Sequence, residues 1–281
     1  ALNYEGANYG LPYSIENIAL IRNTDLVPDA PATWAEVEEV ALALQADGTV
    51  DVPLAIQQAP GDPFHNMPLF SALGGYVFGE NADGSLNPAD IGIDSEGGLA
   101  AARAFGAWSE SGLISGDLEY DQMTEAFGSG QAPFAITGPW AVPSFSDVNF
   151  VVEPFPPVDG GEARPFVGVQ ALMLSAFAEN PLVAQTFLLD FMATQEAALA
   201  LFEADPRPPA HLGALAEVSS DPNILGFGEA GKNGTPMPAI PEMGSVWQAW
   251  TDAYQLIFTG EDPEAAFQGA AEQIRNLIEE G

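Results

Sequence analysis

Four aromatic side chains stand beside turn residues or at the ends of expected elements, where their rings can face a cleft. They are Phe64, Tyr120, Trp140 and Trp247. Flat apolar rings suit the faces of sugar rings, because axial C–H groups pack on the aromatic face while the hydroxyls bond to carboxylates and amides. Core packing is the alternative for each ring taken alone. We keep it for Trp34, Trp108 and Trp250, which occupy helical positions among apolar neighbours.

Groups suited to catalysis or metal binding are sparse. The chain has no cysteine, which excludes disulfides, thiolate nucleophiles and Cys-based zinc sites. His65 and His211 lie far apart without ligand-like spacing, and we find neither a Gly-rich phosphate loop nor a Gly-x-Ser-x-Gly elbow. Two carboxylates astride a sugar bond could always be chosen from forty acidic residues, so their presence does not identify a glycosidase. We expect no cofactor and no metal.

The charge balance argues against nucleic acid and anionic membranes as partners. Forty acidic residues stand against six basic ones, for a formal charge of −34. Nucleic acid and anionic membrane surfaces both need Lys and Arg, so neither is an expected partner. An acidic proteome and a salt-adapted source both fit this acidic surface. No apolar run is long enough to span a bilayer, and the N-terminus shows no signal-peptide pattern, so an export signal would have to lie upstream.

Strands alternate with helices along the chain, which predicts an α/β architecture with mainly parallel sheets. A capping box at Thr33 and Glu36 opens the first helix. The expected helices cover residues 33–46, 67–73, 94–110, 121–127, 180–193, 195–203, 245–258 and 263–280. The expected strands cover residues 15–21, 52–57, 133–137, 150–154 and 167–174, and the first should have neighbours on both sides.

Seven short pieces are spread in order over nearly the whole chain. They are Tyr4-Glu-Gly with Leu11-Pro12, Glu16 and Leu20-Ile21; Thr33-Trp34; Pro68-Leu69 with Gly74-Gly-Tyr-Val-Phe78; Glu125-Ala-Phe127; Gly138-Pro-Trp140-Ala141; Pro165-Phe-Val-Gly-Val169; and Met237-Pro-Ala-Ile-Pro241 followed by Trp247. In this order the chain resembles the maltose/maltodextrin-binding proteins, the solute receptors of sugar ABC importers.

The resemblance implies an α/β, two-lobe fold like that of periplasmic binding proteins, with sugar bound in the cleft between lobes joined by crossing strands. Residues 1–16 would be a remnant of the N-terminal lobe and the first crossing strand. Residues 17–167 and 218–281 would form a complete C-terminal lobe, and 168–217 would return to the N-terminal lobe. That lobe would be partial, because on the order of 100 of its residues have no counterpart here.

The resemblance also implies roles for six residues. Glu16 would be a ligand-binding carboxylate, and Tyr120, Trp140 and Trp247 would form a stacking platform. Phe64 stands where the family has a tyrosine, so stacking survives without the hydroxyl. Met237 would make an apolar contact near the platform.

We therefore expect a non-enzymatic, extracytoplasmic receptor, periplasmic or lipid-anchored, that passes maltose or malto-oligosaccharides to the membrane subunits of an ABC importer by lobe closure. The missing N-terminal segment, or another chain, would cover residues 168–217. Three alternatives stay open: a receptor for another di- or oligosaccharide, a glycoside hydrolase and a non-binding interaction domain. A hydrolase needs two cleft carboxylates about 5–10 Å apart, whereas Glu16 is the one nominated here.

Overall fold

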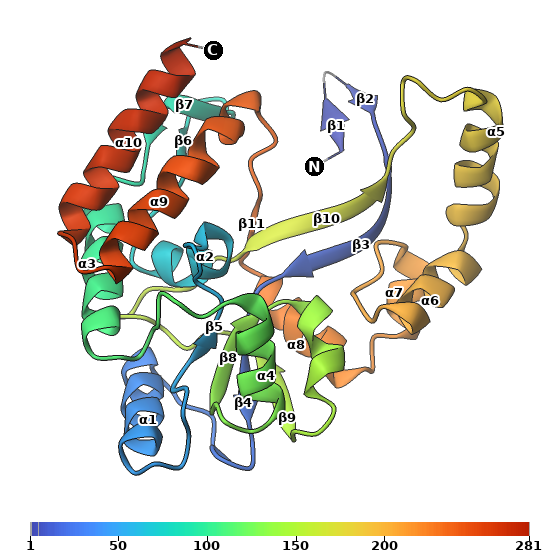
Figure 1. Cartoon of the computed structure of the whole chain (residues 1–281). Helices are drawn as coiled ribbons and strands as arrows, with labels where there is room; N and C mark the ends of the chain where they lie inside the picture. The colour runs from blue at the N-terminus through green and yellow to red at the C-terminus, as the bar shows by residue number, and fades with distance from the viewer. Residues whose placement is uncertain (1, 5, 281) are drawn as a thin grey trace.

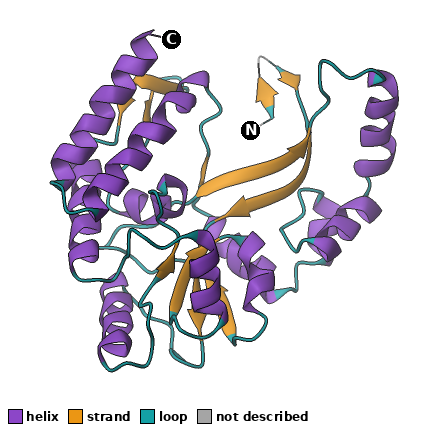
Figure 2. Cartoon of the chain, viewed as in Figure 1, coloured by secondary structure: helices purple, strands orange, loops and turns teal. Residues whose placement is uncertain are grey.

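The computed structural model describes residues 2–4 and 6–280, so Glu5 of the Tyr4–Gly6 piece lies outside the described residues. Figure 1 shows a large body, which holds most of the helices, and a smaller arm at the right that carries α5 (Pro181–Thr186), α6 (Gln195–Ala204) and α7 (Leu212–Glu217). Two long strands that lie side by side run from the body toward the arm, and one of them leads through a loop into its first helix (Figure 1). In the lower part of the body helices lie around a group of strands, and a short hairpin lies at its upper edge (Figure 2). The chain is thus α/β, as the alternating pattern predicted.

The sheet of the body has four strands in the order β5 (Ala55–Ile56), β8 (Phe134–Thr137), β4 (Ala19–Asn23) and β9 (Phe150–Glu153). Only the β5–β8 pair is parallel, since β4 runs antiparallel to both β8 and β9. The prediction of mainly parallel sheets is therefore wrong. The reason is that β4 leaves the crossing strands and runs outward, whereas β8 and β9 run back toward them.

The crossing strands are β3 (Leu11–Asn17) and β10 (Phe166–Leu172), which pair antiparallel, with the short β11 (Thr235–Pro236) parallel to the start of β10. The expected single run over 15–21 is divided at Ile18 into β3 and β4. Of these two strands, β4 has a strand on each side, whereas β3 lies at the edge of its sheet. The free edge of β3 instead meets a loop, where the Ile15 N–H donates to the Pro208 carbonyl at 2.9 Å and the Ala210 N–H donates to the Tyr13 carbonyl at 3.0 Å.

Local capping explains where the helices of the body begin. Thr33 Oγ1 accepts from the Glu36 N–H at 3.3 Å, while the Glu36 carboxylate reaches the Ala32 N–H rather than that of Thr33. The second helix begins at Pro63, four residues before its predicted start, because Asp62 caps it. The body contains α1 (Trp34–Ala46), α2 (Pro63–Ala72), α3 (Glu96–Glu110), α4 (Tyr120–Gly128), α8 (Pro222–Gly231), α9 (Val246–Phe258), α10 (Pro263–Glu280), the 3₁₀ turns η1 (Pro139–Phe145) and η3 (Pro241–Ser245), and the hairpin β6 (Phe78–Glu80) and β7 (Leu86–Ile91).

Two apolar clusters hold the body together. The larger one lies among α2, α3, α9 and α10 and contains Phe70, Phe105, Trp250 and Phe267. The smaller one packs α4, η1 and α8 against the sheet through Met123, Phe127, Phe145 and Phe227. Residues 168–217 contribute no side chain to either cluster. The lobe boundaries at 17–167 and 218–281 remain our prediction.

The arm consists of α5 (Pro181–Thr186), the π-helical turn η2 (Phe187–Met192), α6 (Gln195–Ala204) and α7 (Leu212–Glu217). Neither α5 nor η2 has a buried residue. Phe177, in the loop before α5, is 95% exposed, and the rings of Phe187 and Phe191 are also exposed. The arm therefore presents a wide apolar face to solvent.

Most of the few cations connect distant parts of the chain. Arg22 in β4 donates to both carboxylate oxygens of Glu153, at 2.8 and 3.0 Å, and to the carbonyls of Val27 and Pro28. Arg275 in α10 is bidentate to Asp94 at 2.6 and 2.9 Å, across 181 residues. Arg103 of α3 pairs with Glu264 of α10 through a single hydrogen bond from Nη1. These charge-assisted bonds join elements that the chain order keeps apart.

Candidate functional site

One face of the crossing strands carries the polar part of the site. Side chains alternate between the two faces of a strand, so Phe166, Gly168 and Gln170 share a face of β10. Glu16 of β3 pairs directly with Gly168 and therefore points to the same face. Gly168 leaves room for it, because a Cβ there would lie 3.3 Å from Glu16 Cγ.

Four rings form a continuous aromatic row beside this face: Trp140, Phe64, Phe166 and Trp247. Phe64, in the first turn of α2, stacks on Phe166 at 6.0 Å with an interplanar angle of 27°. The ring centre of Phe64 lies 6.3 Å from that of Trp140, and Phe166 lies 6.1 Å from Trp247. Trp140 and Trp247 are half-buried, so each keeps part of its surface open. The structure thus brings three of the predicted rings together through Phe166, which sequence reasoning did not nominate.

Trp140 owes its position to a glycine. It lies in the first turn of η1, directly after strand β8, and its ring rests on the backbone of Gly138. A Cβ at Gly138 would lie 2.1 Å from the Trp140 ring, far inside contact distance. The Gly138-Pro-Trp140 sequence therefore sets the angle of the ring.

Tyr120 and Met237 lie at the edges of the row. Tyr120 begins α4 and is half-buried against the smaller cluster, as Trp140 is. Burial raises the pKa of its phenol, Asp121 raises it further, and nearby Arg207 opposes both. Met237 follows β11, its N–H donates to the Val167 carbonyl at 3.3 Å, and its side chain is 39% exposed. Neither has a close ring contact with the row among the described residues.

The carboxylate of Glu16 is enclosed by protein donors. Its Oε1 accepts from Gln170 Nε2 at 2.7 Å and its Oε2 accepts from Arg207 Nη1 at 2.7 Å. Arg207 also donates from Nε to Asp205 at 2.6 Å, and its guanidinium carbon lies 5.9 Å from the centre of the Trp140 ring. Burial lowers the pKa of Arg207, but Asp205 and Glu16 more than compensate, so the pKa is raised and the charge is permanent.

Sequence reasoning missed Arg207 and Gln170. Arg207 lies 191 residues from Glu16, and its Pro-rich surroundings read as an ordinary loop. Its rarity was the one available signal, since the chain has only six basic residues.

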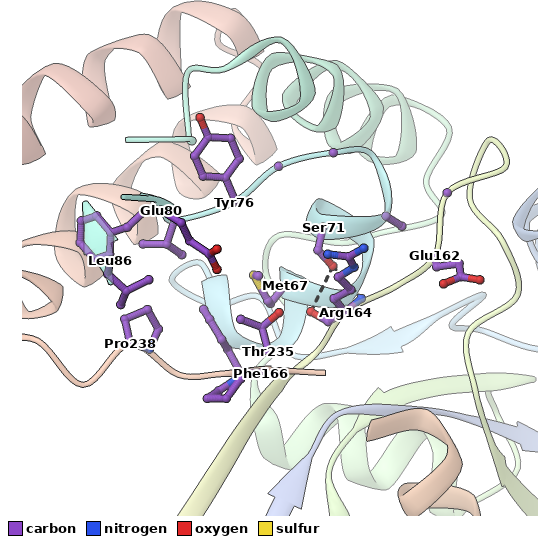
Figure 3. A pocket seen from close by; sticks show the side chains of 17 residues that line it. Met67, Ser71, Tyr76, Glu80, Leu86, Glu162, Arg164, Phe166, Thr235 and Pro238 are labelled. Atoms are coloured by element: carbon purple, nitrogen blue, oxygen red, sulfur yellow. Dashed lines mark hydrogen bonds between the residues drawn. The ribbon is translucent and has the colours of Figure 1, made fainter. Parts of the chain in front are cut away.

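A separate pocket of about 510 Å³ adjoins the row at Phe166. Figure 3 shows Met67 at its centre, with Ser71 and Arg164 on one side and Glu80 and Leu86 on the other. Ser71 Oγ accepts from the Arg164 N–H at 2.8 Å and donates to the Arg164 carbonyl at 3.1 Å. The pocket is lined by none of the six predicted site residues.

Two features of the described residues bear on the class of site. No group of three or more His, Cys, Asp or Glu side chains in residues 2–4 and 6–280 could hold a metal ion. In the same part of the chain, no helix combines the length and the apolar character that crossing a membrane requires. The assembled groups, an aromatic row beside paired polar side chains, suit reversible binding of a ligand with both apolar faces and hydroxyls.

Comparison with known proteins gives a consistent result. Residues 1–226 match the family model described as bacterial extracellular solute-binding protein. The galactooligosaccharide-binding protein of Bacillus subtilis (strain 168) is 31% identical over 286 residues, which cover 96% of this chain and 66% of the relative. The maltodextrin-binding protein MdxE of the same organism is 28% identical over 98% of this chain and 67% of its own length.

A third relative is a maltooligosaccharide ABC transporter solute-binding lipoprotein of Streptococcus pneumoniae (strain ATCC BAA-255 / R6), 28% identical over 98% of this chain and 66% of its own length. The chain therefore spans about two thirds of the length of these curated relatives. All three are named as binding proteins for oligosaccharides or dextrins.

Proposed function

Because the chain belongs to the bacterial extracellular solute-binding protein family, we propose that it is a receptor for maltose or malto-oligosaccharides. The sugar would stack on Trp140 and Trp247, with Phe64 and Tyr120 extending the platform and Met237 making an apolar contact. Its hydroxyls would meet the polar end of the site at Glu16. The observation that carries this proposal is the continuous row of Trp140, Phe64, Phe166 and Trp247 beside the Glu16 carboxylate.

The family sets the compartment and the class of activity. Its members are extracellular, which confirms the expected extracytoplasmic location. The family and its relatives are binding proteins rather than enzymes, which argues against the glycoside hydrolase alternative. We propose the same for this chain, with sugar released unchanged.

A receptor for galactooligosaccharides is the second candidate for the ligand, because a relative named for that ligand is 31% identical to this chain. Ring stacking suits both sugar types, since each presents a face of axial C–H groups. The choice between them depends on the hydroxyls that meet the polar end of the site.

The proposed partners are the membrane subunits of an ABC importer, by analogy with the relative named as part of an ABC transporter. Closure of two lobes about the β3–β10 strands would signal that sugar is bound. We also propose that an N-terminal lobe segment, or another chain, covers residues 168–217. The exposed side chains of Phe177, Phe187 and Phe191 support this part of the proposal.

Calorimetric titration of the full-length protein with maltotriose and with galactotriose tests the function. Trp140→Ala should weaken binding of the preferred sugar about 30-fold, because a lost aromatic anchor costs about 2 kcal/mol. Phe258→Ala is the control, since it removes a half-buried ring about 16 Å along α9 from Trp247. No binding of either sugar by the parent, or equal affinities in parent and Trp140→Ala, would refute the proposal.

A further inference from the structure

We propose that Arg207 is a sugar-contacting residue, which donates hydrogen bonds to the hydroxyls of a neutral oligosaccharide lying on Trp140. Glu16 and Asp205 act as positioning residues that hold its guanidinium, and Gln170 is a second polar contact. This inference rests on the proposed function and names the polar half of that site.

The hydrogen bonds of Arg207 leave most of its donors free. A guanidinium has five N–H donors in a rigid plane. One from Nε goes to Asp205 and one from Nη1 goes to Glu16. The other three have no hydrogen-bond partner among the described residues. The side chain is 22% exposed, so a ligand can reach them. Two carboxylates thus fix the plane of the fork while leaving three donors available.

The carboxylate oxygens of Glu16 already accept hydrogen bonds from other side chains of the protein. Each of its oxygens accepts one hydrogen bond, from Gln170 and from Arg207 respectively. Its main effect is therefore to orient these two side chains. The amide oxygen of Gln170 has no hydrogen-bond partner within the described part of the chain, so it can accept from a sugar hydroxyl. Together the two residues offer both donors and an acceptor, as a hydroxyl requires.

The backbone at Arg207 is held in place before any ligand arrives. Pro206, Pro208 and Pro209 surround it, and each fixes its own φ angle. The loop is also tied to β3, since the Ile15 N–H donates to the Pro208 carbonyl at 2.9 Å. Preorganisation of this kind lowers the ordering cost of binding. The guanidinium lies over the Trp140 ring, 5.9 Å from its centre, so its free donors lie beside a sugar that stacks on the part of the ring left open.

The charges of the cluster define the class of sugar. Arg207 carries one positive charge, while Glu16 and Asp205 carry two negative ones within 2.7 Å of it. The local balance is negative, and the whole chain carries a formal charge of −34. A uronic acid would meet net repulsion, whereas neutral hydroxyls would not. We infer a preference for neutral oligosaccharides.

The test compares Arg207→Ala and Arg207→Lys with the parent in the full-length protein, by calorimetry with maltotriose and galactotriose. Arg207→Ala should bind the preferred sugar about 10- to 100-fold more weakly, because it loses charged hydrogen bonds. Arg207→Lys should bind the preferred sugar about 10-fold more weakly, because an ammonium keeps the charge but lacks the planar set of N–H donors of a guanidinium. Arg103→Ala is the matched control, since Arg103 is an exposed arginine paired with Glu264 away from the site. Melting temperatures of all variants separate lost affinity from lost folding.

The outcomes distinguish the two proposals. If Arg207 merely occupied the Trp140 ring until a sugar displaced it, Arg207→Ala would bind more tightly and the inference would be wrong. Unchanged affinity in both folded Arg207 variants would also overturn it. If Trp140→Ala weakens binding in the same series, such results leave the proposed function standing. A uronate-terminated oligosaccharide that binds as tightly as its neutral counterpart would overturn the inferred preference.

Discussion

An alanine at Gly138 would place its methyl group inside the ring of Trp140. The added Cβ would lie 2.1, 2.3 and 2.6 Å from three ring carbons, Cζ3, Cη2 and Cε3. Carbon atoms in contact lie about 3.5 Å apart or more, so the ring has to move by about 1.4 Å. The backbone at Gly138 has φ −104° and ψ −178°, which any residue adopts without strain. The clash with the ring is therefore the main effect of the substitution.

The expected result is a loss of sugar affinity with little loss of stability. Trp140 is half-buried and can turn outward, but it then leaves its place 6.3 Å from Phe64. Misplacing an aromatic anchor should weaken binding about 10- to 30-fold. Relief of the clash by an outward turn should keep the cost in stability near the lower end of the range for overpacking, about 1 kcal/mol.

Calorimetry with the preferred trisaccharide, alongside thermal melting, measures both quantities. Gly244→Ala is the matched control, because the same methyl group there meets nothing within 4 Å and Gly244 lies three residues before Trp247. If Gly138→Ala binds sugar as tightly as the parent and the control, the ring is not a stacking surface at its observed angle, and the reasoning fails.

Two further predictions concern turnover and the arm. Long incubation with maltotriose should release no glucose at any pH; release that disappears in Glu16→Gln would instead support a hydrolase. In the monomeric 281-residue chain without added polypeptide, amides of residues 169–174 and 185–191 should exchange faster than those of β8 (Phe134–Thr137), because neither segment has a buried residue whereas all of β8 is buried. Equal protection of these segments would show that the arm needs no cover.

Local signals predicted the helices well. Thr33 marks the start of α1, and the Asn180-Pro181 pair marks the start of α5, because capping and proline geometry act over a few residues. Helix α8 was missed, although Asp221 caps it through two N–H groups and Pro222 follows, because its sequence contains three glycines. The β6–β7 hairpin was read only as its turn, at 81–84.

The pairing of strands that lie far apart in the sequence could not be predicted from local sequence patterns. The direction of β4 relative to β8 depends on how the chain enters the body from the crossing strands, and no residue of β4 encodes it. Phe166 and Arg207 were not nominated for the same reason, since their contacts are with Phe64 and Glu16, which lie far away in the sequence. The rings Phe64, Tyr120, Trp140 and Trp247 were selected by their places beside turns and at element ends, and the family resemblance supplied the roles that position alone could not.

Because cations are scarce in this chain, acidic residues and arginines should differ in how well they tolerate substitution. Forty acidic residues repel one another, so replacing an exposed Asp or Glu by a neutral residue relieves repulsion and should cost little. Arg22, Arg207 and Arg275 each join segments more than a hundred residues apart, and the sequence holds few other cations to take their places. Substitutions should therefore be tolerated at exposed acidic positions of this protein and should be destabilising at these three arginines.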